Sequence, residues 1–161
     1  MSKPARPYAD TAVSIDRSVA EVMAQLRTRN ATGLQFTEEG NRSTLRFMWR
    51  STSGAELCAR FVVEVKPMKW RGRTTPTSKQ IAEMYAQEKR RLFRVLVYFI
   101  KNLFEAVDGG LLSIEQALLP HLEAGGGQTL GELLVPRLHQ LRAGPLARAL
   151  GAPALEAADD A

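Results

Sequence analysis

The sequence contains few of the residues that build cross-links and metal centres. Cys58 is the only cysteine among 161 residues, which excludes an internal disulfide framework and favours a reducing compartment. The chain has only two histidines besides, so it cannot build a closed four-ligand zinc site without carboxylates. We therefore expect no metal and no cofactor.

Long apolar segments are also missing. The longest purely apolar run, residues 95–100, is far too short to cross a bilayer. Residues 1–7 are rich in proline and charge and lack the apolar stretch of a secretory signal. We therefore expect a cytoplasmic protein with no membrane partner.

No catalytic motif stands out in the chain. The histidines His121 and His139 lie in segments where a structural role is expected of them. The glycine-rich residues 124–127 follow no predicted strand and precede no Gly-Lys-Ser/Thr sequence, so they do not form a phosphate-binding loop. We expect no catalytic residue and no small-molecule substrate, and an enzyme of unrecognised type is the third hypothesis.

The strongest pattern predicts one long helix over residues 77–110. Thr77 and Gln80 have the spacing of a capping box, and Gly109-Gly110 offers a left-handed end. Large apolar residues recur between these ends at steps of three or four, which places them on one helical face. They are Ile81, Met84, Tyr85, Leu92, Val95, Leu96, Phe99, Leu103 and Val107.

Shorter elements are expected before this helix. A brief alternation predicts a strand over residues 11–15, and the capping-box spacing of Ser18 and Glu21 predicts a helix over residues 19–29. Alternation and turn residues then predict three antiparallel strands. Their expected ranges are 34–37, 43–50 and 55–66.

Two further capping boxes, Ser113 with Gln116 and Thr129 with Glu132, predict short C-terminal helices. The order strand, helix, three strands, helix gives an α+β fold, with a sheet of three to four strands covered on one face by the long helix. The expected organisation is a flexible arm (1–7), one domain (8–150, comprising 8–76, 77–110 and 111–150) and a disordered acidic tail (151–161).

A basic sheet face and a basic loop favour nucleic acid as the partner. The formal net charge is +5, and alternation places most arginines of the strands on the face away from the helix. Trp70 either stacks on a base or folds back onto the core. We expect single-stranded DNA to be favoured, with these contacts: Arg42, Arg46, Arg50, Arg60, Lys66, Lys69, Trp70, Arg71 and Arg73.

The alternative hypothesis is a module that binds another protein or a second copy of itself. The C-terminal half of the long helix carries apolar residues on nearly every side, which requires burial on several sides. The sheet, the C-terminal helices or another subunit could supply that burial. The expected interface residues are Phe93, Val97, Tyr98 and Phe104.

A resemblance accompanies these patterns over residues 8–150. It is carried by capping and packing residues: Ser18 with Glu21, Asn41-Arg42, Ile100-Lys101, Glu105-Ala106-Val107, Gly109, Ile114-Glu115, Leu118-Leu119, Thr129-Leu130-Gly131-Glu132 and Pro136. In these the chain resembles a family of small, uncharacterised proteins encoded by bacteriophages and related mobile elements. The resemblance implies a phage origin and the host cytoplasm, and it transfers no active site.

Overall fold

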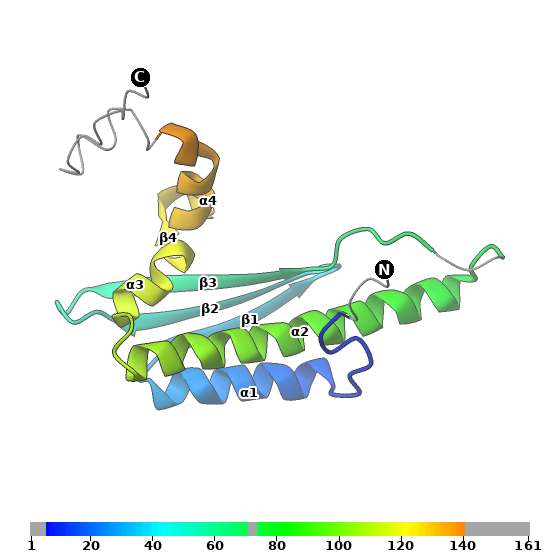
Figure 1. The fold of residues 1–161 in the computed structure, drawn as a ribbon, viewed down its shortest axis with the longest axis horizontal. Coiled ribbons are helices and arrows are strands. Elements are labelled where there is room, and N and C mark those ends of the chain that lie inside the picture. The colour runs from blue at the N-terminus through cyan, green and yellow to red at the C-terminus, as the bar shows by residue number, and fades with distance from the viewer. Residues whose placement is uncertain (1–5, 71–73, 141–161) are drawn as a thin grey trace, which may run out of the picture.

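The computed structural model describes residues 6–70 and 74–140, with residues 139 and 140 described by their backbone alone. Helices α1 and α2 lie on one side of a three-stranded sheet, and the C-terminal elements rise on its other side (Figure 1). The elements are α1 (Ile15–Thr28), β1 (Thr32–Glu39), β2 (Arg42–Arg50), β3 (Glu56–Glu64), α2 (Ser78–Asp108), α3 (Ile114–Leu118), the 3₁₀ turn η1 (Leu119–His121), β4 (Glu123–Ala124), the 3₁₀ turn η2 (Gly125–Gly127), β5 (Gln128–Thr129), α4 (Leu130–Leu134) and the 3₁₀ turn η3 (Val135–Gln140).

The N-terminal part corrects the predicted order of elements. Residues 11–14 form no strand, and α1 begins at Ile15, capped by the Ser14 Oγ that accepts from the Arg17 amide at 3.2 Å. Ser18 lies fully buried one turn inside the helix and donates its hydroxyl to the Ser14 carbonyl at 3.1 Å. The N-cap of α1 is therefore Ser14, one turn before the predicted Ser18. Without the predicted first strand, the order of elements is α-β-β-β-α.

The three strands form one antiparallel sheet in the order β1-β2-β3, as predicted. Leu45 of β2 lies opposite Phe36 of β1 and Phe61 of β3, so these three side chains share the face that packs on the helices. Because side chains alternate along a strand, Arg46 and Arg60 fall opposite each other on the other face.

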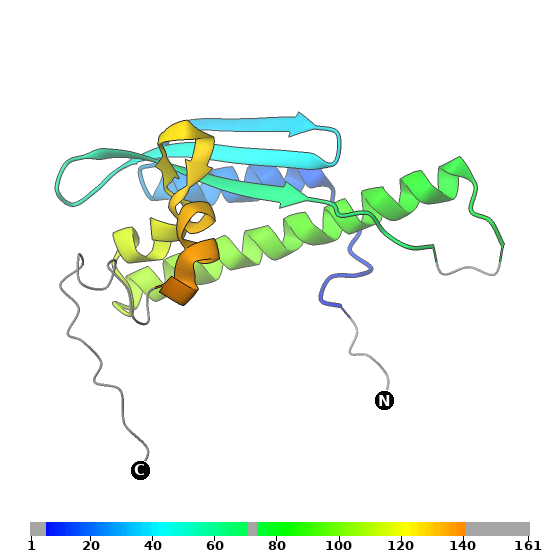
Figure 2. The same ribbon diagram turned by 90° about the horizontal axis from the view of Figure 1, so that it is seen from above.

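Two helices, and not the long helix alone, cover the apolar face of the sheet (Figures 1 and 2). Arg29 at the end of α1 pairs with Asp108 at the end of α2, and Glu21 pairs with Arg94 in their middle, so the helices run parallel. The core between them and the sheet is fully or almost fully buried. It includes Val22, Leu26, Leu45, Phe47, Ala59, Phe61, Val97, Ile100, Phe104 and Leu118.

Helix α2 has the predicted ends and extends beyond the sheet. Both capping-box hydrogen bonds between Thr77 and Gln80 are present, and Gly110 adopts a left-handed conformation after the helix. The first turns, residues 78–83, are exposed and project past the sheet with the loop that precedes them (Figure 1).

Three of the four expected interface residues are instead core residues. The side chains of Phe93, Val97 and Phe104 are 2%, 3% and 4% exposed, because α1 and the sheet cover them. Tyr98 alone is exposed, and its ring stacks on Tyr8 at a centroid distance of 4.9 Å. Most apolar side chains on the C-terminal half of α2 are therefore buried within one chain. Helix α1, which was not predicted to pack against α2, supplies part of that burial.

The C-terminal elements follow the two predicted capping boxes, which both form. Glu115 of α3 accepts hydrogen bonds from the Thr52 amide and hydroxyl at 2.9 and 2.8 Å, which attaches α3 to the turn between β2 and β3. Ala59 of β3 makes an isolated bridge to Leu122, so the chain then crosses onto the outer face of the sheet (Figure 2). No helix in the described ranges is long and apolar enough to cross a membrane.

Replacing Phe93 by alanine should destabilise the protein by about 3–5 kcal/mol, because it removes a buried ring that packs edge-on against Phe36. Val95→Ala, at a side chain that is 38% exposed, should cost less than about 1 kcal/mol. Urea unfolding followed by circular dichroism measures both values. Equal losses for the two variants would contradict the assignment of Phe93 to the core.

Candidate nucleic-acid interface

The outer face of the sheet carries an ion-pair network centred on Glu123. Arg46 and Arg60 are cross-strand neighbours, and like charges in that position are destabilising on their own. The Glu123 carboxylate relieves this repulsion, since its Oε1 lies 2.7 Å from Arg46 Nε and 3.8 Å from Arg60 Nε. A single carboxylate from β4 thus bridges two guanidiniums of β2 and β3.

Arg60 is the most enclosed member of this network. Its side chain is 6% exposed, Nη1 donates to the Gly127 carbonyl at 2.7 Å and Nη2 pairs with Glu132. Arg60 Nε is buried and has no hydrogen-bond partner among the described residues. The sequence predicts that Arg46 and Arg60 are exposed and available to phosphates. This prediction is wrong in the structure, because both arginines already pair with carboxylates.

Acidic neighbours also accompany the other two arginines of this face. Arg50 pairs with Glu56 at 3.2 Å in an exposed bridge. Arg42 lies opposite Glu39 on β1 and opposite Glu64 on β3, without an ion pair to either. The sequence-based prediction of a basic face did not include these acidic neighbours, of which Glu39 and Glu56 follow from the register of the two hairpins.

The carboxylates of the network are held in their charged form. Burial raises the pKa of Glu123, but hydrogen bonds from Arg46 and Cys58 and the charges of both guanidiniums outweigh it, so the pKa lies below the ordinary value. The Thr129 amide, followed by the Arg60 charge, lowers the pKa of Glu132. Burial raises the pKa of the Cys58 thiol, which favours its protonated form.

The end of the sheet nearest the projecting part of α2 has a different character. Lys66 and Lys69 are exposed, and neither pairs with an acidic side chain in the described ranges. Trp70 is half-buried, and its indole Nε1 donates to the Thr74 carbonyl at 2.8 Å. We call Arg42, Lys66, Lys69 and Trp70 the cationic end; Arg71 and Arg73, which were expected to join it, lie outside the described residues.

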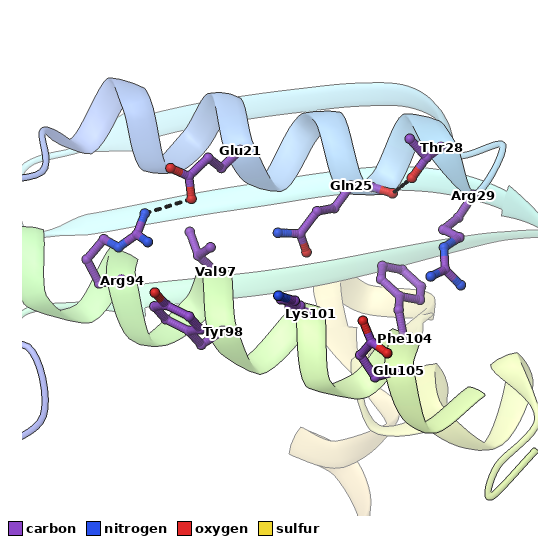
Figure 3. A pocket seen from close by; sticks show the side chains of 10 residues that line it. All are labelled: Glu21, Gln25, Thr28, Arg29, Arg94, Val97, Tyr98, Lys101, Phe104 and Glu105. Atoms are coloured by element: carbon purple, nitrogen blue, oxygen red, sulfur yellow. Dashed lines mark hydrogen bonds and ion pairs between the residues drawn. The ribbon is translucent and has the colours of Figure 1, made fainter. Parts of the chain in front are cut away.

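A groove of about 380 Å³ between α1 and α2 was not expected from the sequence (Figure 3). Arg94 and Glu21 pair across one part of it at 2.7 Å, and Gln25 and Lys101 point into the middle. Acidic and basic side chains alternate along its walls. Such a lining offers no field of one sign, so the groove does not suit a polyanion.

Among the described residues, no catalytic or metal-binding constellation accompanies these surfaces. His121 packs against the Phe61 ring at a centroid distance of 4.3 Å, and burial lowers its pKa. The described ranges contain no cluster of three potential metal ligands. An apolar pocket of about 260 Å³ beside Trp49 and Phe104 lies at the end of the core, and the charged residue in its lining is Arg29, which pairs with Asp108.

Comparisons with known proteins add no further constraint. No family model, curated protein or solved structure matches the chain. The resemblance to phage-encoded proteins stays a prediction from the residues, and function is argued from the geometry of this chain alone.

Replacing Arg60 by alanine should destabilise the protein by about 2–3 kcal/mol, because two carboxylates lose a buried partner. Arg50→Ala removes a bridge whose side chains are 71% and 60% exposed, and should change stability by less than about 0.5 kcal/mol. Denaturant unfolding of the two variants tests this contrast. A stable Arg60→Ala protein would show that the network carries little of the folding energy.

Stability should fall on acidification below about pH 4.5, because Glu115, Glu123 and Glu132 all have a lowered pKa in the folded state. As pH falls, these carboxyls bind protons in the unfolded state before they do so in the folded state. The stabilisation is therefore fully present above pH 4.5, the ordinary pKa of glutamate, and is lost as pH falls through the folded-state pKa values, of which that of Glu115 is about 2. Urea midpoints across this range measure the loss. Glu115→Gln should flatten the curve, and an unchanged curve would exclude the Thr52 hydrogen bonds as a cause.

Proposed function

We propose that the protein binds nucleic acid at the cationic end, with single-stranded DNA as the favoured ligand. The observation that carries this proposal is a basic stretch that holds two exposed lysines, Lys66 and Lys69, without acidic partners in the described ranges. Residues 65–82 of the sequence contain Lys66, Lys69, Arg71, Arg73 and Lys79 and no acidic residue. This stretch follows the sheet and leads into the projecting start of α2.

Lys66 and Lys69 are suited to phosphate contacts for two reasons. Both side chains are exposed and free of acidic partners in the described ranges, so binding a phosphate breaks no ion pair. Each contact releases a counterion from the nucleic acid, which makes the affinity depend on salt. Arg42 lies at the same end of the sheet because the Val65 amide bonds the Asn41 carbonyl at 3.0 Å.

Trp70 supports single strands over duplexes. The hydrogen bond from its indole to the Thr74 carbonyl satisfies the only polar group of the ring and restrains its orientation. A restrained aromatic ring beside lysines is the combination that sequence-tolerant single-strand binders use, with phosphates on the cations and a base on the ring. In a duplex the bases are already stacked and cannot occupy the ring.

The double variant Lys66→Gln/Lys69→Gln should weaken binding of a fluorescein-labelled oligothymidylate in an anisotropy titration. If both lysines contact phosphates, the log–log dependence of affinity on salt should become shallower by about 1.4, at roughly 0.7 for each contact. Duplex DNA and RNA of the same length should bind more weakly than the single-stranded DNA.

The matched control is Arg27→Gln/Lys101→Gln, which removes the same charge from exposed positions on the helical side. It should keep the wild-type affinity and salt dependence to a first approximation. Absence of wild-type binding at low salt would overturn the proposed function. Equal weakening by both double variants would reduce it to a general effect of net charge.

A protein partner is the second candidate, favoured by a different observation. The C-terminal elements α4 and η3 carry exposed apolar residues, with Leu134, Val135 and Leu138 at 40%, 63% and 52% exposure. Binding through these residues would depend little on salt. A second copy of the chain would reveal itself as a dimer in sedimentation that Val135→Ser/Leu138→Ser abolishes.

A further inference from the structure

Residues 123–134, from β4 to α4, cover part of the outer face of the sheet, and we call them the clasp. In Figure 1 they rise above the strands, on the side opposite α1, and in Figure 2 they lie in front of the strands. Their polar contacts with the strands converge on two arginines: Glu123 with Arg46 and Arg60, Glu132 with Arg60, and the Gly127 carbonyl with Arg60. Leu130 also packs against the core, so the two arginines hold the part of the clasp that lies over the outer face.

The clasp holds its own shape through internal contacts. Strands β4 and β5 pair with each other, and Thr129 and Glu132 form a reciprocal capping box on α4. The Leu130 amide donates to the Leu122 carbonyl at 2.9 Å, and Leu122 is 9% exposed in the core. Loss of the arginine contacts would thus free a preformed unit that stays tethered at Leu122.

The two carboxylates occupy positions that phosphate oxygens could take. Guanidinium groups bind carboxylate and phosphate with the same fork geometry, and Glu123 bridges two of them. The network is incomplete as it stands, since Arg60 Nε is buried with no hydrogen-bond partner in the described residues. A phosphate offers more acceptor oxygens than a carboxylate and could satisfy this donor as well.

We propose that the clasp is a displaceable cover, in which Glu123 and Glu132 compete with the phosphates of a bound nucleic acid for Arg46 and Arg60. This inference rests on the proposed function and adds its regulation. A strand that binds first at the cationic end continues along β2 toward Arg46. There it exchanges the carboxylates of the clasp for its own phosphates, and the outer sheet face becomes part of the binding site.

The test compares oligothymidylate binding by the wild type and by Glu123→Gln/Glu132→Gln. Glutamine keeps an acceptor oxygen for the arginines and for the α4 capping box but removes the charge that competes with phosphate. The variant should bind several-fold more tightly because no carboxylate competes with the phosphates. Its salt dependence should also become steeper, because in the wild type the two released carboxylates take up cations and offset part of the counterion release.

The control for net charge is Asp16→Asn/Glu105→Gln, at exposed positions on the helical side without ion pairs in the described ranges. Removing the same charge there should leave the salt dependence as in the wild type. Equal behaviour of the two double variants would overturn the clasp and leave the proposed function intact. No binding by the wild type or by either variant would overturn both.

Amide hydrogen exchange distinguishes a displaceable clasp from a purely structural one. If the ion pairs were only structural, binding of nucleic acid would not speed exchange in the clasp. Adding oligothymidylate to the wild type should speed amide exchange in residues 123–134, while α1 and α2 keep their protection. Unchanged or stronger protection of the clasp in the bound protein would overturn the proposal. Because this measurement uses the unmodified chain, it stays decisive even if the variant folds less stably.

Discussion

The structure depends on one apolar interface, between one face of the three-stranded sheet and two parallel helices. Phe47 and Phe61 from the sheet and Val97 and Phe104 from α2 are nearly or fully buried there, and Leu26 of α1 completes the layer. At about 1.5–3 kcal/mol for each large side chain, this burial is the dominant favourable term of the fold. It also determines which strand residues face away from the helices.

On that outward face two positive charges lie close together. The antiparallel register places Arg46 directly opposite Arg60. Because side chains alternate along a strand, neither arginine can turn to the core side of the sheet. The solution comes from far along the chain, where Glu123 and Glu132 enter the face from β4 and α4. The same contacts that neutralise the arginines hold the C-terminal elements on the sheet, so charge balance and architecture are linked at this point.

Local signals made much of the fold predictable, and long-range contacts account for what was missed. Thr77 with Gln80 and Gly110 mark the ends of α2 through bonds within a few residues, and these ends are confirmed. Ser14 and Ser18 carry similar short-range signals, which one sequence cannot rank. The partners of Arg60 and the helix that buries Phe93 are set by tertiary packing, which local periodicity does not encode.

In the proposed mode of binding, the distribution of charge makes the loop, and not the sheet, the first contact for a polyanion. Arg46 and Arg60 already have carboxylate partners, so a phosphate must displace a bound group to reach them. Lys66 and Lys69 require no such exchange in the described part of the chain, because they are exposed, follow the end of β3 and pair with no acidic side chain there. A strand that arrives there gains free cations before it meets the clasp. Binding at the loop is therefore the step that makes competition for the sheet arginines possible.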